Sequence, residues 1–160
     1  MNLDKEKLKN FEKLPADVRR EFSLLMNQYG QKKKESHIRS DFMSFVKHVW
    51  PDFIEGSHHK EVAKKFNEIA EGKTKRVIIN MAPRHTKSEF ASYLLPAWMV
   101  GRNPKLKIIQ STNTTELSVR FGRKAKALMD SPEYKEVFKT RLKEDSQAAG
   151  KWETQQGGEY

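Results

Sequence analysis

The residues best suited to chemistry lie in one short stretch, which we call loop 81–88. It consists of Met81, Ala82, Pro83, Arg84, His85, Thr86, Lys87 and Ser88. In the phosphate-binding pattern G-x-x-x-x-G-K-[ST], backbone N–H groups surround the phosphates, the lysine neutralises their charge and the hydroxyl binds Mg²⁺. Lys87 and Ser88 match the end of this pattern, whereas Met81 and Thr86 occupy its two glycine positions. The loop therefore predicts a nucleotide site with both glycines replaced.

Thr86 is the departure with the larger physical consequence. Glycine before the lysine lets the backbone approach the phosphates closely. Threonine must either adopt a comparable φ and ψ at some cost or reshape the loop. We expect weaker or geometrically altered nucleotide binding rather than its loss. The alternative is that Lys87 and Ser88 simply open an exposed helix.

Arg84 adds a second cation three residues before Lys87. A guanidinium at this distance could reach a γ-phosphate and stabilise negative charge in the transition state. The alternative is a surface arginine or a member of a salt bridge.

The segments on either side are expected to place the loop between a strand and a helix. Residues 76–80 (RVIIN) form a short β-branched run typical of a buried strand. A helix pattern begins at Ser88 and closes near Gly101, with an interruption at Pro96.

A second strand is predicted over residues 105–112 (KLKIIQST), followed by a helix capped by Asn113 or Thr114. This order predicts a βαβ unit and a parallel sheet. We therefore expect an α/β fold, a partial P-loop NTPase with a parallel sheet flanked by helices and preceded by an N-terminal helical segment.

The rest of the chain is expected to be mainly helical. Helices are predicted over residues 15–30, 38–49, 57–72 and, as a short segment capped by Ser131, from residue 132. The polar tail has short candidate strands around Leu142 and Trp152. We expect residues 1–56 to form the N-terminal helical segment and residues 57–160 to form the N-terminal half of the ATPase domain.

Composition restricts the classes of function. The chain has 160 residues, no cysteine and a formal net charge of +10, which excludes disulfides and favours a polyanionic partner such as nucleic acid. The first residues lack the apolar segment of a secretory signal, and no apolar run approaches the roughly 20 residues of a membrane span. A soluble protein in a reducing cytoplasm is the simplest expectation.

Several motifs occur together in one order. The stretch EGKTKRVIINMAPRHTKSEFASYLLPAWMVGRNPKLKIIQST is followed by ELSVRFGRKAKALMDS. This order resembles the large terminase subunit of tailed bacteriophages. The ATPase domain of that family commonly carries a Pro-Arg-x-Gly-Lys-Ser loop, then a Pro-Ala-Trp helix and a Gly-Arg-Asn-Pro turn. The resemblance extends from about Asp41 to Tyr160.

The resemblance implies a motor that couples ATP hydrolysis to the pumping of viral DNA into a procapsid. It implies that Lys87 binds the β- and γ-phosphates of ATP, that Ser88 binds Mg²⁺ and that Arg84 acts as an arginine finger in cis. Met81 to Thr86 would supply the backbone cradle.

The same resemblance implies an adenine contact before the first strand, where His58 and His59 lie. The alternative is a solvated helix start. The implied partners are double-stranded DNA, the portal protein, the small terminase subunit and further copies of the chain in a ring, without a membrane. The implied location is the host cytoplasm, transiently at the procapsid portal.

Two features of such motors are missing from the sequence. No apolar strand ending in an acidic pair follows Lys87, and no cluster of nuclease carboxylates is present. We therefore expect the amino-terminal piece of a longer ATPase that is inactive on its own.

Two other functions remain open. One is a helicase-like nucleotide-binding domain, against which the Pro-Ala-Trp helix argues. The other is a basic DNA-binding or terminase-associated module without nucleotide affinity. A basic helix face would contact DNA phosphates in that module, although such faces are usually solvated. It comprises Arg120, Arg123, Lys124 and Lys126.

Overall fold

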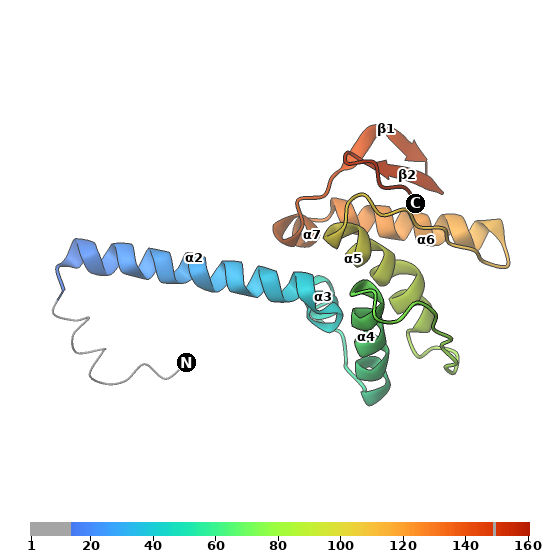
Figure 1. The fold of residues 1–160 in the computed structure, drawn as a ribbon, viewed down its shortest axis with the longest axis horizontal. Coiled ribbons are helices and arrows are strands. Elements are labelled where there is room, and N and C mark those ends of the chain that lie inside the picture. Colours follow the sequence, from blue (N-terminus) through green and yellow to red (C-terminus); the bar gives the residue numbers. More distant parts are fainter. Residues whose placement is uncertain (1–13, 149) are drawn as a thin grey trace. The chain divides into compact units, whose positions relative to one another are not determined.

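The computed structural model describes residues 14–148 and 150–160, and this part of the chain is mostly helical (Figure 1). The chain divides into two compact units between Ser36 and His37. The elements in chain order are α2 (Ala16–Ser40), α3 (Phe42–Val49), α4 (Ser57–Ala70), the π-helix η1 (Glu89–Leu94), α5 (Leu95–Arg102), α6 (Thr115–Asp130), α7 (Pro132–Val137), β1 (Leu142–Ala148) and β2 (Lys151–Thr154).

Helix α2 continues through Gly30, where the sequence predicted its end. A glycine inside a helix costs only about 1 kcal/mol relative to alanine, and the residues that follow include good helix formers such as Gln, Lys and Glu. The sequence left residues 31–37 between two predicted helices, and that prediction is wrong because α2 includes them. Most of the large apolar side chains of α2 are exposed, including those of Phe22 and Leu25.

An aromatic cluster forms the core of residues 37–160. The buried ring of Phe42 on α3 meets the rings of Phe66, Phe90 and Trp98 edge-on, with centroid distances of 5.1, 5.5 and 5.4 Å. Edge-to-face contacts at this distance favour aromatic packing beyond the burial of area alone. The cluster joins α3 and α4 to the helical stretch that follows loop 81–88.

A polar network fixes the start of α3 against α4. Asp41 caps α3 by accepting a hydrogen bond from the Ser44 amide at 2.7 Å, and the side-chain amide of Asn67 donates to the other Asp41 oxygen at 2.8 Å. Burial raises the pKa of the Asp41 carboxyl, but the hydrogen bonds from Ser44 and Asn67 outweigh it, so the net pKa lies below the ordinary value. Helix α4 is thereby held in register with α3.

The predicted α/β fold is wrong. The strands in the described part of the chain are β1 and β2, which pair antiparallel, and the expected P-loop NTPase sheet is not formed there. Residues 76–80 belong to no helix or strand, and of residues 105–112 only Lys107 forms a β-bridge. Ile78 is 89 % exposed and Ile109 is 98 % exposed. β-branched residues favour a strand only where a neighbouring strand supplies hydrogen bonds and packing. Ile78 has no backbone partner among the residues described.

The helix after loop 81–88 widens where the sequence predicted an interruption. Residues 89–94 form the π-helix η1, in which the amide of Leu95 donates to the carbonyl of Phe90, and α5 follows without a break. Pro96 has no amide to donate and clashes with the preceding turn of a regular α-helix. A wider turn accommodates such a proline, so the helix continues to Arg102.

The C-terminal hairpin packs on α6 through Trp152. Its indole donates to the carbonyl of Gly122 at 3.2 Å, and its ring stacks on Tyr160 with a centroid distance of 4.7 Å. The predicted helix caps Thr114 and Ser131 and the predicted strands in the tail are confirmed.

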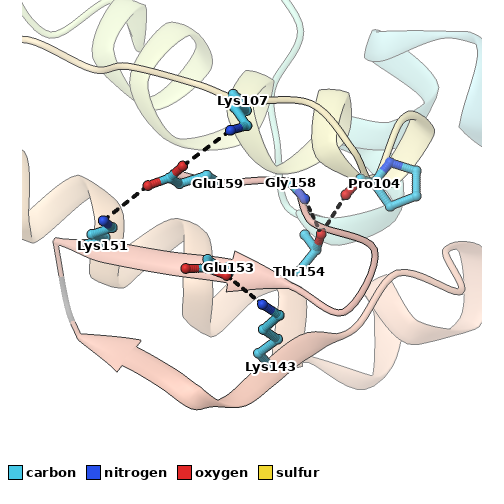
Figure 2. Close-up of polar contacts among 8 residues, drawn as sticks. All are labelled: Pro104, Lys107, Lys143, Lys151, Glu153, Thr154, Gly158 and Glu159. Carbon is cyan, nitrogen blue, oxygen red and sulfur yellow. Dashed lines mark hydrogen bonds and ion pairs between the residues drawn. The ribbon is translucent and has the colours of Figure 1, made fainter.

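The last residues return to the segment that follows α5 (Figure 2). The amide of Gly158 donates to the carbonyl of Pro104 at 3.1 Å and to the Thr154 hydroxyl at 2.8 Å. The carboxylate of Glu159 forms ion pairs with Lys107 at 3.8 Å and Lys151 at 3.1 Å. Lys107 and Glu159 also form an isolated parallel β-bridge. Among the described residues, this bridge is the only β-pairing of the predicted strand 105–112 with another segment.

None of the helices in the described part of the chain is long and apolar enough to cross a membrane.

Candidate functional site

Loop 81–88 contains the only two non-glycine residues with positive φ among the residues that the structure describes. Arg84 has φ 66° and Thr86 has φ 58°. This left-handed conformation costs an ordinary residue about 1–2 kcal/mol, and glycine adopts it readily. Thr86 therefore takes the conformation that the consensus glycine would favour.

The backbone around Thr86 presents unpaired hydrogen-bond donors. The first bond of the helix runs from the Phe90 amide to the Thr86 carbonyl at 2.9 Å. The amides of Lys87, Ser88 and Glu89 form no hydrogen bond within the described residues. Free amides at a helix start, together with the helix dipole, favour an anion there.

The predicted phosphate-binding side chains lie on the exposed side of this helix start. Lys87 and Ser88 are exposed, as is Arg84. Neither Lys87 nor Arg84 forms an ion pair in the part of the chain that the structure covers. Both cations are therefore available to an anion.

The inner side of the loop is closed. A hollow beneath it is bounded by His59, Val62, Ile79, Met81, His85, Thr86, Lys87 and Phe90. It has no space for a water molecule. A triphosphate would therefore have to lie on the outer face of the loop, where Ala82 and Pro83 are exposed as well.

The two histidines that were predicted to contact adenine lie in different environments. The ring of His58 is exposed, and its centroid lies 5.5 Å from that of His85 in the loop. His59 is only 7 % exposed and lies beneath the loop, with its Nε2 2.6 Å from the Thr86 hydroxyl oxygen. The contact between His59 and Thr86 was not predicted from the sequence, because the two residues are 27 positions apart and no local pattern links them.

The environment of His59 favours its neutral form. Burial lowers the pKa of its imidazole, and the nearby rings of His58 and His85 lower it further, while the carboxylate of Glu55 partly opposes them. A neutral imidazole has one donor and one acceptor nitrogen. His59 can therefore connect a donor on one side with an acceptor on the other.

An ion pair joins the start of the helix to α6. The ammonium of Lys124 lies 2.8 and 2.6 Å from the two carboxylate oxygens of Glu89, and 4.9 Å from the ring centre of Tyr93. Lys124, which belongs to the predicted basic face, is thus occupied within the protein. Arg120 and Arg123 on the same helix are exposed and have no ion pair with any described residue.

The described residues contain no group of three or more His, Asp or Glu side chains that could hold a metal ion. In the site itself, the Ser88 hydroxyl is the group suited to Mg²⁺, which prefers oxygen ligands and keeps several waters. The arrangement as a whole can bind a phosphate group through amides and two cations. It offers a metal ion one hydroxyl ligand.

Comparison with known proteins produced no match to a protein-family model, to a curated protein or to a solved structure.

Proposed function

We propose that the chain binds the phosphates of Mg·ATP on the outer face of loop 81–88. One observation carries the proposal: consecutive free amides at Lys87, Ser88 and Glu89 follow two left-handed residues, next to a lysine with no partner in the described structure. Unpaired donors and an ammonium group at one point favour a multiply charged phosphate.

The residues divide the work as follows. The ammonium of Lys87 neutralises the β- and γ-phosphates, and the free amides donate to phosphate oxygens. The Ser88 hydroxyl coordinates Mg²⁺, which screens phosphate charge when it is bound with the nucleotide. The Arg84 guanidinium approaches the terminal phosphate and stabilises charge that develops during its transfer.

In the same proposal, the chain is the ATP-binding portion of a viral DNA-packaging motor of the terminase large-subunit type. The order of the loop, the Pro-Ala-Trp helix and the Gly-Arg-Asn-Pro turn supports this assignment. ATP hydrolysis and DNA translocation then belong to the assembled motor, with double-stranded DNA, the portal protein, the small subunit and further copies of the chain as partners.

A calorimetric titration with Mg·ATP tests the binding step. We expect saturable binding that is lost in Lys87→Ala and retained in Lys139→Ala. Lys139 is a matched control, because it is exposed and has no ion-pair partner among the residues described. Absence of binding at millimolar Mg·ATP in the unsubstituted protein would contradict the proposal.

A second candidate function is a DNA-binding module without nucleotide affinity, which the free Arg120 and Arg123 favour. It predicts DNA binding that weakens steeply with salt and does not change in Lys87→Ala. Replacement of both arginines by glutamine would abolish that binding. Titration of the unsubstituted protein and of Lys87→Ala with Mg·ATP and with DNA therefore distinguishes the two functions.

A further inference from the structure

Thr86 holds a backbone conformation that its side chain disfavours. Its φ of 58° lies in the left-handed region, and the loop has no glycine at this point to relieve the strain. A position of this kind persists when surrounding contacts compensate its cost. The side chain of Thr86 makes two such contacts.

The contacts form a chain of hydrogen bonds with one direction. The Gly56 amide donates to His59 Nδ1 at 2.9 Å, so that nitrogen is the acceptor and the proton of the neutral ring is on Nε2. Nε2 then donates to the Thr86 hydroxyl oxygen at 2.6 Å, and the hydroxyl donates to the His85 carbonyl at 2.6 Å. Every donor in the chain has an acceptor in this one tautomer.

The ring of His59 is held in place from both sides. Its centroid lies 4.8 Å from the ring of Phe53 and 5.2 Å from that of Phe90, and 7 % of the residue is exposed. The ring is anchored on α4, and its Nδ1 accepts from the residue that precedes that helix. Its Nε2 therefore occupies a fixed point beneath the loop.

We propose that His59 is a positioning residue that holds loop 81–88 in its left-handed conformation through the Thr86 hydroxyl. The hydrogen bonds of the Thr86 hydroxyl stabilise a left-handed backbone conformation that a glycine would adopt without them. His59 acts on the loop and does not touch the ligand. The effect on ligand affinity rests on the proposed function, whereas the effect on loop conformation does not.

The proposal predicts that the two positions depend on each other. In His59→Phe the ring is kept and both hydrogen bonds are lost, so Thr86 leaves the left-handed region. In His59→Gln the side-chain amide can still donate to Thr86, so the loop is largely retained. In Thr86→Gly the backbone adopts positive φ without a partner, so a further change at His59 has little effect.

The first experiment measures loop conformation without any ligand. In the full chain labelled with ¹⁵N and ¹³C, the ¹⁵N shifts of the His59 ring report its tautomer. The backbone shifts and the amide-to-α-proton coupling of Thr86 report φ. We expect His59 Nε2 to carry the proton and Thr86 to have positive φ in the unsubstituted protein and in His59→Gln, but not in His59→Phe.

The second experiment titrates the same variants with Mg·ATP. A hydrogen bond of this kind contributes about tenfold to the population of the conformation that it holds. We expect His59→Phe to weaken binding about tenfold when Thr86 is present, and less than about twofold in the Thr86→Gly background. Such non-additivity is the measure of a direct coupling.

The outcomes separate the two proposals. If Thr86 keeps positive φ in His59→Phe, or if Nδ1 carries the proton, the positioning role is wrong. If the conformational changes occur as expected but the unsubstituted protein does not bind Mg·ATP, the positioning role stands and the proposed function fails. If His59→Phe does not fold, Thr86→Val removes the hydroxyl from the loop side and Thr86→Ser restores it, with the same expected loss and recovery.

Discussion

The α-carbon of Gly158 lies so close to the carbonyl oxygen of Pro104 that a Cβ atom at Gly158 would be 2.4 Å from it. The neighbouring atom belongs to the backbone, so it cannot rotate away. This approach allows the Gly158 amide to donate to the Pro104 carbonyl. The same amide donates to the Thr154 hydroxyl, which in turn donates to the Pro104 carbonyl (Figure 2). The end of the chain is thereby attached to the segment that follows α5.

Gly158→Ala should detach this tail. We expect the free energy of unfolding to fall by about 2–3 kcal/mol, because the added methyl group forces the two backbone segments apart. Urea unfolding followed by tryptophan fluorescence measures the change. Gly157→Ala is the control: its φ of 89° is strained for alanine, but it has open space around it, so about 1 kcal/mol is expected. Equal effects of the two substitutions would contradict the close-contact explanation.

Gly101→Ala should disturb the core. A Cβ atom there would lie 2.7 Å from the Phe138 ring and from the Tyr134 hydroxyl, and both rings are fully buried. The Tyr134 hydroxyl donates to the Ala97 carbonyl at 2.9 Å, so movement of this ring also strains a buried hydrogen bond. We expect a loss of about 1–3 kcal/mol in thermal or urea unfolding. An unchanged midpoint would show that the rings can move without cost.

The Lys124–Glu89 pair should contribute little to stability. Both side chains are about one-third exposed, at 36 % and 32 %, so solvent screens their attraction. A double-mutant cycle with Lys124→Met and Glu89→Gln should give a coupling of about 0.5 kcal/mol that decreases with salt. A coupling of several kcal/mol, insensitive to salt, would mean that the pair is effectively buried.

The stability of the protein should fall with acid because of His59. Burial lowers the pKa of its imidazole below the ordinary value of 6.5, so the folded state binds a proton less readily than the unfolded chain. The stabilisation is therefore complete above about pH 6.5 and is lost as the pH falls through the lower folded-state pKa. Protonated Nδ1 would also oppose the Gly56 amide that now donates to it.

Unfolding measured between pH 8 and pH 5 checks this dependence. The titratable groups whose charges act on the His59 imidazole are His58, His85 and Glu55. His59→Gln is the matched comparison, because it leaves those groups in place. An identical pH profile in His59→Gln would assign the dependence to the neighbouring groups.

Arg84→Gly should stabilise the fold and weaken the site. Glycine relieves a left-handed conformation that Arg84 holds at φ 66°, but it also raises the entropy of the unfolded chain, so a net gain of about 0.5 kcal/mol is expected. The same substitution removes a free guanidinium from the loop and should reduce Mg·ATP affinity. In Arg84→Gly the unfolding temperature should therefore rise while the affinity for Mg·ATP falls. A loss of stability would show that Arg84 has a structural contact.

The helices and their caps could be predicted from the sequence because their hydrogen bonds are local. Thr114 and Ser131 cap α6 and α7 through amides three residues ahead, and apolar spacing marks the face that each helix buries. The start of a helix at the end of loop 81–88 could also be predicted from the sequence alone. The length of α2 could not, since one glycine was given more weight than the favourable residues around it.

The strands and the support of the loop were decided by tertiary structure. Residues 76–80 have strand propensity, but a strand needs a partner, and no local rule indicates whether one is present. The contact of His59 with Thr86 and that of Gly158 with Pro104 likewise join positions far apart in the chain. The sequence by itself therefore determined which residue types lie at the loop and where helices form. Only the packing of distant segments decided that loop 81–88 is supported by the buried His59 side chain and not by a parallel sheet. Long-range hydrogen bonds depend on partners that local patterns do not specify.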